Sequence, residues 1–249
     1  MLNQETINKM NEMHLSAMAK AFKAQAVDAG ACELSFEERI GMLVDAEWTS
    51  RKNNRLKKLI HSAGFPDTAA CIENVEYHAD RGLDKSKLLK YASCDYIAEK
   101  RNLLIMAATG GGKTYLACAF GMAACRNYCT VKYIRLPELL AELALSKINS
   151  TYKSLLKKFK QVNLLILDDW LIYPLKDTEA HDVLEIVESR YKKGSIIFCS
   201  QVDVGGWHSN LGESLVADAI CDRIAHESYR ILIGGNDSMR KRKGLKEEG

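Results

Sequence analysis

Residues 102–124 read NLLIMAATGGGKTYLACAFGMAA and join a short apolar run, a glycine-rich turn and a longer apolar run. The first run predicts a buried strand, and the second, which is apolar on every side, predicts a buried helix. Backbone N–H groups converge on phosphate oxygens only where the connecting residues are small, and a helix N-terminus adds a favourable dipole. The order strand, glycine-rich turn, Lys113, Thr114 and helix is therefore that of a phosphate-binding loop, or P-loop.

The P-loop predicts a nucleotide site with Mg²⁺. Lys113 would reach the β- and γ-phosphates, and the Thr114 hydroxyl would bind Mg²⁺. The pattern G-x-x-x-x-G-K-[ST] has glycine where this chain has Ala107. If that position needs a left-handed backbone, alanine there would cost roughly 1–2 kcal/mol and weaken nucleotide binding. The predicted nucleotide-binding residues of the loop are Ala107, Ala108, Thr109, Gly110, Gly111, Gly112, Lys113 and Thr114.

A second motif, LLILDD at residues 164–169, places two carboxylates after four apolar residues. Consecutive strand residues face opposite ways, so the two acids have different roles unless the strand has ended. We predict that Asp168 binds Mg²⁺ and contacts the nucleotide, and that Asp169, just past the strand end, orients or deprotonates the attacking water. The alternative is a strand end capped by solvated acids. Gln201, after the apolar run SIIFC, would lie beside the γ-phosphate if its strand lies between the other two.

Five short apolar runs are candidate strands, and most of them are separated by segments with the periodicity of a helix. This alternation favours a parallel sheet with helices on both faces, an α/β fold. Near the end of one such helix, Arg190 is expected to form a structural ion pair with Glu185 or Glu188. The candidate strands are residues 102–106, 131–135, 163–167, 195–199 and 230–233.

The first part of the chain has helical periodicity and no convincing strand. Ser35 is followed three residues later by Glu38, a capping-box pattern that predicts a long helix starting near Phe36. We therefore divide the chain into a helical N-terminal domain, residues 1–68, and a larger α/β domain, residues 69–249.

Composition excludes several classes of protein. With 47% apolar and 27% charged residues, the 249-residue chain is neither disordered nor fibrous. The 8 cysteines form no C-x-x-C pair and are expected to be buried thiols, and the 6 histidines lack ligand spacing, so no metal besides Mg²⁺ is expected. No signal peptide and no run of about 18 apolar residues is present, which predicts a cytoplasmic protein without membrane contact.

Five positive charges fall within eight positions without an intervening acid. On a helix, Arg51, Arg55 and Lys58 share one face. Such a run is ordinarily a solvated helix surface. The alternative is that these residues contact DNA phosphates, in which case DNA binding would be independent of base sequence and sensitive to salt. A further lysine group precedes residues 164–169. The candidate DNA-binding residues are Arg51, Lys52, Arg55, Lys57 and Lys58.

The segments TGGGKTYLA, LLILDDW, FCSQVDVGGWH, LVADAICDRIAH and GGNDSMR occur in this order along the chain. Together they resemble the IstB-like AAA+ ATPases, which are transposition helper proteins of bacterial insertion sequences. The resemblance covers nearly the whole chain, and bacterial replicative helicase loaders are similar in the ATPase part. It implies a P-loop AAA+ domain with a five-stranded parallel sheet, preceded by a small all-helical domain. The chain departs from the family at Ala107, where glycine is usual, and carries Asp169 where many AAA+ proteins have glutamate.

The resemblance also implies roles and partners. In AAA+ assemblies the nucleotide lies between subunits, which makes Arg223 the candidate arginine finger for a neighbour's γ-phosphate. Arg240 is the candidate nucleotide sensor of the C-terminal lid. ATP with Mg²⁺, double-stranded DNA, a cognate transposase and further copies of the same chain are the implied ligands and partners.

We therefore predict an ATP-binding and ATP-hydrolysing regulator of DNA transposition that assembles into multimers on DNA. Three alternatives remain at this point. One is a replicative helicase loader, and another is a small-molecule kinase, which also uses a P-loop. The third is a nucleotide-dependent scaffold with little hydrolysis, an alternative that Ala107 and Asp169 leave open.

Overall fold

The computed structural model describes residues 2–212, 214–235 and 238–239. The chain forms two compact units, Met1–Lys58 and Leu59–Gly249. The boundary predicted from the sequence, at residue 68, lies further along the chain, after the last residue of the long helix α3 (Phe36–Ala63). Within the described ranges, no helix is both long enough and apolar enough to cross a membrane.

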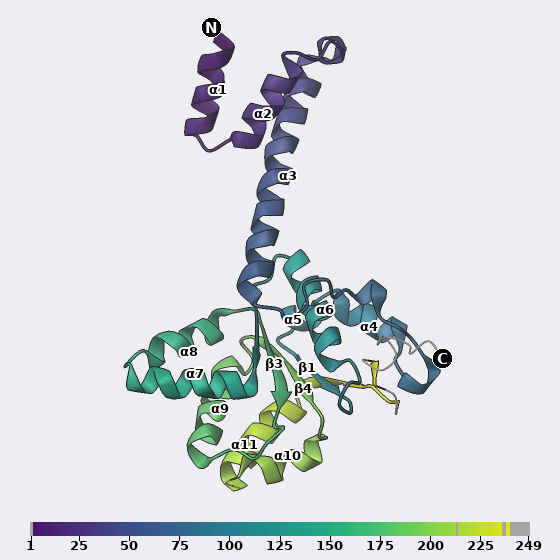
Figure 1. Cartoon of the computed structure of the whole chain (residues 1–249), viewed down its shortest axis with the longest axis vertical. Coiled ribbons are helices and arrows are strands. Elements are labelled where there is room, and N and C mark those ends of the chain that lie inside the picture. Colours follow the sequence, from purple (N-terminus) through teal and green to yellow (C-terminus); the bar gives the residue numbers. More distant parts are fainter. Residues whose placement is uncertain (1, 213, 236–237, 240–249) are drawn as a thin grey trace, which may run out of the picture. The chain divides into compact units, whose positions relative to one another are not determined.

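The N-terminal unit is helical, and the predicted capping box begins α3. Ser35 N donates to Glu38 Oε2 (2.8 Å), and Glu38 N donates to Ser35 Oγ (3.2 Å). Glu47 on α3 then ties α2 in place, because its Oε2 accepts from Ala17 N (2.9 Å) and Met18 N (3.1 Å). Figure 1 shows α2 alongside the first half of α3. The elements that precede α3 are α1 (Leu2–Glu12), α2 (Ser16–Gln25) and the short 3-10 helix η1 (Gly30–Glu33).

The C-terminal unit contains a five-stranded sheet in the order β2-β3-β4-β1-β5, and every pairing is parallel. The fold class predicted from the sequence is thereby confirmed. Because β4 lies between β1 and β3, the condition set for Gln201 is met. The strands are β1 (Asn102–Met106), β2 (Val131–Arg135), β3 (Leu164–Trp170), β4 (Ser195–Ser200) and β5 (Ser228–Leu232).

Helices connect the strands and cover both faces of the sheet, as the alternating pattern predicts. The helical elements of this unit are η2 (Ile72–Asn74), η3 (Ala79–Arg81), α4 (Lys85–Ala92), α5 (Asp95–Ala98), α6 (Lys113–Arg126), α7 (Leu136–Ile148), α8 (Tyr152–Gln161), α9 (Asp177–Arg190), α10 (Val204–Leu211) and α11 (Ser214–Ala225).

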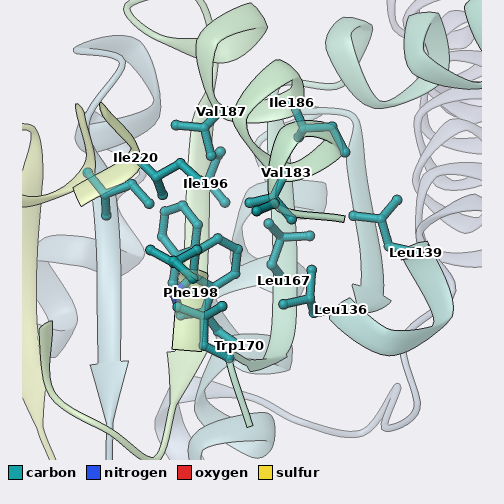
Figure 2. Packing of buried hydrophobic residues seen from close by; sticks show 14 of the residues in the cluster. Leu136, Leu139, Leu167, Trp170, Val183, Ile186, Val187, Ile196, Phe198 and Ile220 are labelled. Atoms are coloured by element: carbon teal, nitrogen blue, oxygen red, sulfur yellow. The ribbon is translucent and has the colours of Figure 1, made fainter. Parts of the chain in front are cut away.

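The two sheet faces pack against different helices because successive strand residues alternate. On one face, Leu167 and Phe198 belong to a cluster that α7, α9 and α11 close, and Figure 2 shows Trp170 and Ile220 in the same cluster. On the other face, Ile166 meets the buried helix α6: a Cβ added to Gly121 of α6 would lie 2.9 Å from Ile166 Cδ1. The predicted buried helix after the P-loop is confirmed, and close packing explains its glycine.

Strand β3 differs from the sequence-based prediction. The prediction ends this strand at Leu167, whereas β3 continues through the two acids to Trp170. Between these two residues the register with β4 shifts, and Asp169 has a φ of 52°. This is a bulge, a local irregularity that changes the direction of a side chain within a strand. The acids therefore face different surroundings although the strand has not ended.

Candidate nucleotide-binding site

The P-loop connects β1 to α6, and its backbone requires glycine at two positions. Gly110 (φ 77°) and Gly112 (φ 93°) are left-handed, a conformation that glycine adopts without strain. Gly111 is close to the first loop residue, because a Cβ added to it would lie 2.8 Å from Ala107 Cβ. Ala107 itself has no positive φ, so the left-handed strain considered for this alanine does not arise.

Lys113 is 7% exposed and extends back over the loop. Its Nζ donates to the carbonyl oxygens of Ala107 (2.8 Å) and Ala108 (2.9 Å). Phosphate oxygens that enter the loop would offer this ammonium group stronger, charged acceptors. The structure thus places the predicted phosphate-binding lysine inside the loop.

The predicted magnesium ligands Thr114 and Asp168 meet directly. Thr114 Oγ1 donates to Asp168 Oδ2 at 2.6 Å, and Asp168 is 3% exposed. The described residues contain no cluster of three or more His, Cys, Asp or Glu that could hold a metal ion on its own. One carboxylate and one hydroxyl beside a phosphate-binding loop nevertheless fit Mg²⁺, which takes few protein ligands and completes its shell with phosphate oxygens and water.

Tyr133, which the sequence analysis missed, supports Asp168. Its hydroxyl donates to Asp168 Oδ2 at 2.8 Å, and the Asp169 backbone N donates to Asp168 Oδ1 at 2.8 Å. Burial, and next the nearby Asp168 carboxylate, raise the pKa of Tyr133 well above its ordinary value, so it remains a hydrogen-bond donor. Only the pairing of β2 with β3 reveals this contact, because the two residues are far apart in the sequence.

Asp169, the candidate water-orienting residue, forms an ion pair with Arg135. Arg135 Nε lies 2.6 Å from Asp169 Oδ2, and a second acid, Glu138, lies 3.5 Å from Arg135 Nη1. The hydrogen bond to Asp169 is the largest cause of a raised pKa of Arg135. Arg135, at the end of β2, is another residue that the sequence analysis missed.

Gln201, which follows β4, reaches the P-loop. Thr109 Oγ1 donates to Gln201 Oε1 at 2.7 Å. The sheet order thus brings residues that follow β1 and β4 together with the two acids of β3 at one edge, where parallel α/β sheets bind ligands.

A pocket of about 370 Å³ opens beside the P-loop, a volume suited to a small ligand. Arg81, also missed from the sequence, helps to build it: Nη1 donates to Glu76 O (2.6 Å) and Nη2 to Gly111 O (3.0 Å). Arg81 therefore joins the segment before the sheet to the loop. The pocket is lined by Asn74, Val75, Glu76, Arg81, Leu83, Thr109, Gly110, Gly112, Lys113, Thr114, Tyr115, Leu116, Asp169, Gln201 and Met239.

Arg223 does not line this pocket. On α11 it donates from Nη2 to Glu188 Oε1 (2.7 Å) and from Nη1 to Ala219 O (2.8 Å). Arg223 and Asn102 both line a small cavity, which lies at the amino ends of the strands, whereas the P-loop lies at their carboxyl ends. Its role as an arginine finger is a proposal about a neighbouring subunit. Arg240, the candidate sensor, lies outside the described residues.

The predicted DNA-binding residues lie on α3 in the N-terminal unit. Arg51 donates to Glu47 Oε1 (2.8 Å) and to His14 O (3.1 Å), and Lys52 Nζ lies 4.7 Å from the centre of the Trp48 ring. The remaining three, Arg55, Lys57 and Lys58, are exposed.

The chain is similar to ATP-binding proteins of insertion sequences. The family model described as IstB-like ATP binding protein matches residues 8–247. An insertion-sequence ATP-binding protein of Sinorhizobium fredii is 40% identical over 241 residues, 97% of this chain and 98% of that protein. The ATP-binding protein of insertion sequence IS1162 from Pseudomonas fluorescens is 35% identical, over 81% of this chain and 87% of that protein.

Solved structures show the same fold. The DnaC helicase loader has a TM-score of 0.58 at 18% identity, over 67% of this chain and 97% of that one. DnaA from Aquifex aeolicus bound to AMPPCP also has a TM-score of 0.58, at 19% identity, over 71% of this chain and 53% of that one. These structures share the arrangement of sheet and helices with the C-terminal unit.

Proposed function

The chain belongs to the IstB-like ATP-binding proteins of insertion sequences, and we propose that it is an ATP-hydrolysing, DNA-binding regulator of transposition. The observation that carries the ATPase proposal is the contact of Thr114 Oγ1 with Asp168 Oδ2 at 2.6 Å. This contact brings the P-loop and β3 together at the point where a nucleotide-bound metal ion would lie.

Each residue at this edge has a role in the proposed reaction. Lys113 would bind the β- and γ-phosphates, while Thr114 and Asp168 would hold Mg²⁺, which neutralises phosphate charge when it is bound. Asp169 would accept a hydrogen bond from the attacking water and orient it toward the γ-phosphate. Gln201 would donate from its amide nitrogen to a γ-phosphate oxygen while its Oε1 accepts from Thr109 Oγ1.

A neighbouring subunit would complete the site. Arg223 lies at the edge of the sheet away from its own P-loop, so it serves only a nucleotide that another copy holds. Release from Glu188 would allow its guanidinium group to stabilise charge on the γ-phosphate. We propose that ATP binding thereby promotes multimer formation, and that hydrolysis remodels or dismantles the multimer.

The partners follow from the family. The exposed basic residues of α3 would contact the phosphates of duplex DNA, and the transposase of the same insertion sequence would be the protein partner. Contacts of this kind predict DNA binding that weakens steeply with salt and depends little on base sequence.

One experiment tests the enzymatic proposal: steady-state ATP turnover of the full chain with and without duplex DNA, alongside nucleotide binding by a fluorescent ATP analogue. Lys113→Ala should lose both binding and turnover, and Asp169→Asn should retain binding and lose turnover. Arg126→Ala, on the exposed end of α6, is the matched control and should behave as the native chain. Undiminished turnover in Lys113→Ala would reject the proposed site.

A second candidate function is a nucleotide-dependent scaffold with little hydrolysis. The ion pair between Arg135 and Asp169 favours it, because an engaged carboxylate is a poor acceptor for a water proton. Nucleotide-dependent particle size without measurable turnover, in the presence and absence of DNA, would support the scaffold over the ATPase.

A further inference from the structure

The backbone at Asp169 and just after it has a conformation that its residues do not favour. Asp169 has a φ of 52° and Leu171 a φ of 51°. Both values lie in the left-handed region, which a bulky apolar residue such as Leu171 rarely adopts. Strained residues of this kind persist only where the surrounding structure holds them. Because Asp169 lines the nucleotide pocket, the contacts that hold the 169–171 segment also decide where its carboxylate lies.

Asn210 of α10 contacts both ends of the stretch that follows β3. Its side-chain Nδ2 donates to Leu171 O at 2.9 Å, and its main-chain O accepts from Leu175 N at 2.8 Å. The last four carbonyl groups of a helix have no partner within the helix, so Asn210, one residue before the end of α10, has this oxygen available. Asparagine is a poor helix former, and its contact with Leu171 gives it a use at this position.

Among the described residues, Ser200 of β4 is the other side chain that reaches the backbone of the 169–171 segment. Ser200 Oγ lies 3.3 Å from Trp170 O but 2.7 Å from Val202 O. A hydroxyl group carries one proton, and the nearer oxygen accepts it. The Trp170 indole is fixed by packing, since its ring centre lies 5.6 Å from that of Trp207. Asn210 is therefore the main side-chain donor to this backbone.

Helix α10 also joins Asn210 to Gln201. The helix begins at Val204, three residues after Gln201, and Asp203 Oδ1 accepts from Gly206 N (3.0 Å) at its start. Trp207 is fully buried, and its Nε1 donates to Val202 O at 3.0 Å, which fixes the helix against the end of β4. The short helix that follows Gln201 therefore also contacts the segment that contains Asp169.

We propose that Asn210 is a positioning residue for Asp169. Its amide holds the 169–171 segment in the left-handed conformation that directs the Asp169 carboxylate into the pocket, and this role rests on the ATPase function proposed above. Without the amide, the segment relaxes toward extended backbone, in which the bulge is lost and the carboxylate turns to the other side of the strand. Nucleotide binding is retained, because the P-loop and the contact of Thr114 with Asp168 lie on other segments.

Steady-state ATP turnover and binding of a fluorescent ATP analogue, both with the full chain, test this role. Asn210→Ala and Asn210→Asp should each lower kcat about five- to tenfold and change nucleotide affinity less than about twofold. An ionised aspartate keeps the size of asparagine but has no proton to donate. Asn127→Ala is the matched control, because Asn127 Nδ2 also donates to a main-chain oxygen, that of Ala123 (3.1 Å), at the end of α6. The control should keep the native kcat.

A double-mutant cycle separates positioning from a general structural effect. Asp169→Asn removes the carboxylate that Asn210 positions, so adding Asn210→Ala to this variant should cause no further loss of its residual turnover. Two independent effects would multiply instead. Circular dichroism checks that every variant remains folded.

The ¹⁹F resonance of 5-fluorotryptophan at Trp170 reports on the segment without any hydrolysis, because Trp170 lies between the two strained residues. This resonance, assigned with Trp170→Phe, should shift or split in both Asn210 variants and remain native in Asn127→Ala. Native kcat in Asn210→Ala, an unchanged Trp170 resonance, or multiplied losses in the cycle would each overturn the proposal. A native chain without turnover would reject the proposed ATPase function instead, and the Trp170 resonance would still decide whether Asn210 holds the segment.

Discussion

Arg135 at the end of β2 and Asp169 in the bulge of β3 form an ion pair in which Nε lies 2.6 Å from Oδ2. The side chain of Asp169 is 23% exposed, so water screens the pair in part. The main effect of the ion pair is therefore to occupy the Asp169 carboxylate. While Arg135 binds this carboxylate, Asp169 is less able to orient water.

Replacing Arg135 should accelerate basal hydrolysis. In Arg135→Ala, Asp169 loses its strongest partner, and turnover without DNA should rise about three- to fivefold, the equivalent of roughly 1 kcal/mol for an exposed ion pair. Arg135→Lys keeps a cation in place and should remain near the native rate. A slower Arg135→Ala enzyme with unchanged nucleotide affinity would mean that the arginine assists the reaction instead.

Removing the Tyr133 hydroxyl should weaken the hold on Mg²⁺. Tyr133→Phe removes one of two donors to Asp168 Oδ2, and loss of an orienting partner typically reduces metal affinity by about tenfold. Mn²⁺ titration followed by electron paramagnetic resonance, with ATP present, measures this directly. Tyr152→Phe, whose hydroxyl contacts Asp182 and Glu185, serves as control. Equal Mn²⁺ affinity in Tyr133→Phe would show that Asp168 needs no such support.

Arg190 should be a major contributor to stability. It is 1% exposed and donates to main-chain carbonyl groups, including those of Phe159, Val162 and Ser195, so the expected pairing with Glu185 or Glu188 is wrong. Arg190→Met leaves these carbonyl oxygens without their hydrogen-bond donor and should lower the free energy of unfolding by about 3 kcal/mol or more. Urea denaturation measures the loss. A change under about 0.5 kcal/mol, the size of an ordinary surface substitution, would contradict this account.

Stability should fall in alkaline solution. Burial raises the pKa of Cys118 and of Cys125 to about 12, from an ordinary value of 9.0. Between these values the folded chain retains protons that the unfolded chain releases, so the stabilisation is complete below pH 9 and is lost as the pH rises above it. Urea denaturation from pH 8 to pH 10.5 should show this loss, with a smaller slope in Cys125→Ala. Identical slopes would assign the alkaline loss to other groups.

The sequence predicted the elements that local patterns specify. The apolar runs marked the strands, the glycine-rich turn marked the P-loop, and the Ser35–Glu38 pattern marked the start of α3, because each depends on residues close together in the chain. The positions of Lys113 and Thr114 followed from the same local pattern.

The missed residues depend on which strands become neighbours. Tyr133 and Arg135 act on Asp168 and Asp169 only because β2 pairs with β3, and no local pattern marks either residue. Arg81 reaches Gly111 from a segment that precedes the sheet. The bulge at Asp169 could not be predicted from the sequence either. A run of apolar residues that ends in acids has the same pattern whether the strand ends there or continues through a bulge.

The placement of β4 between β1 and β3 has a mechanical consequence. Thr114 lies at the start of α6, after the loop that follows β1, and Asp168 lies on β3, so their contact links segments that belong to two strands separated by β4. A nucleotide and its metal would act as a clamp across three strands and oppose any splaying of the sheet. Amide hydrogen exchange along β4 should therefore slow when MgATP binds, although β4 itself contributes none of the residues that hold the metal.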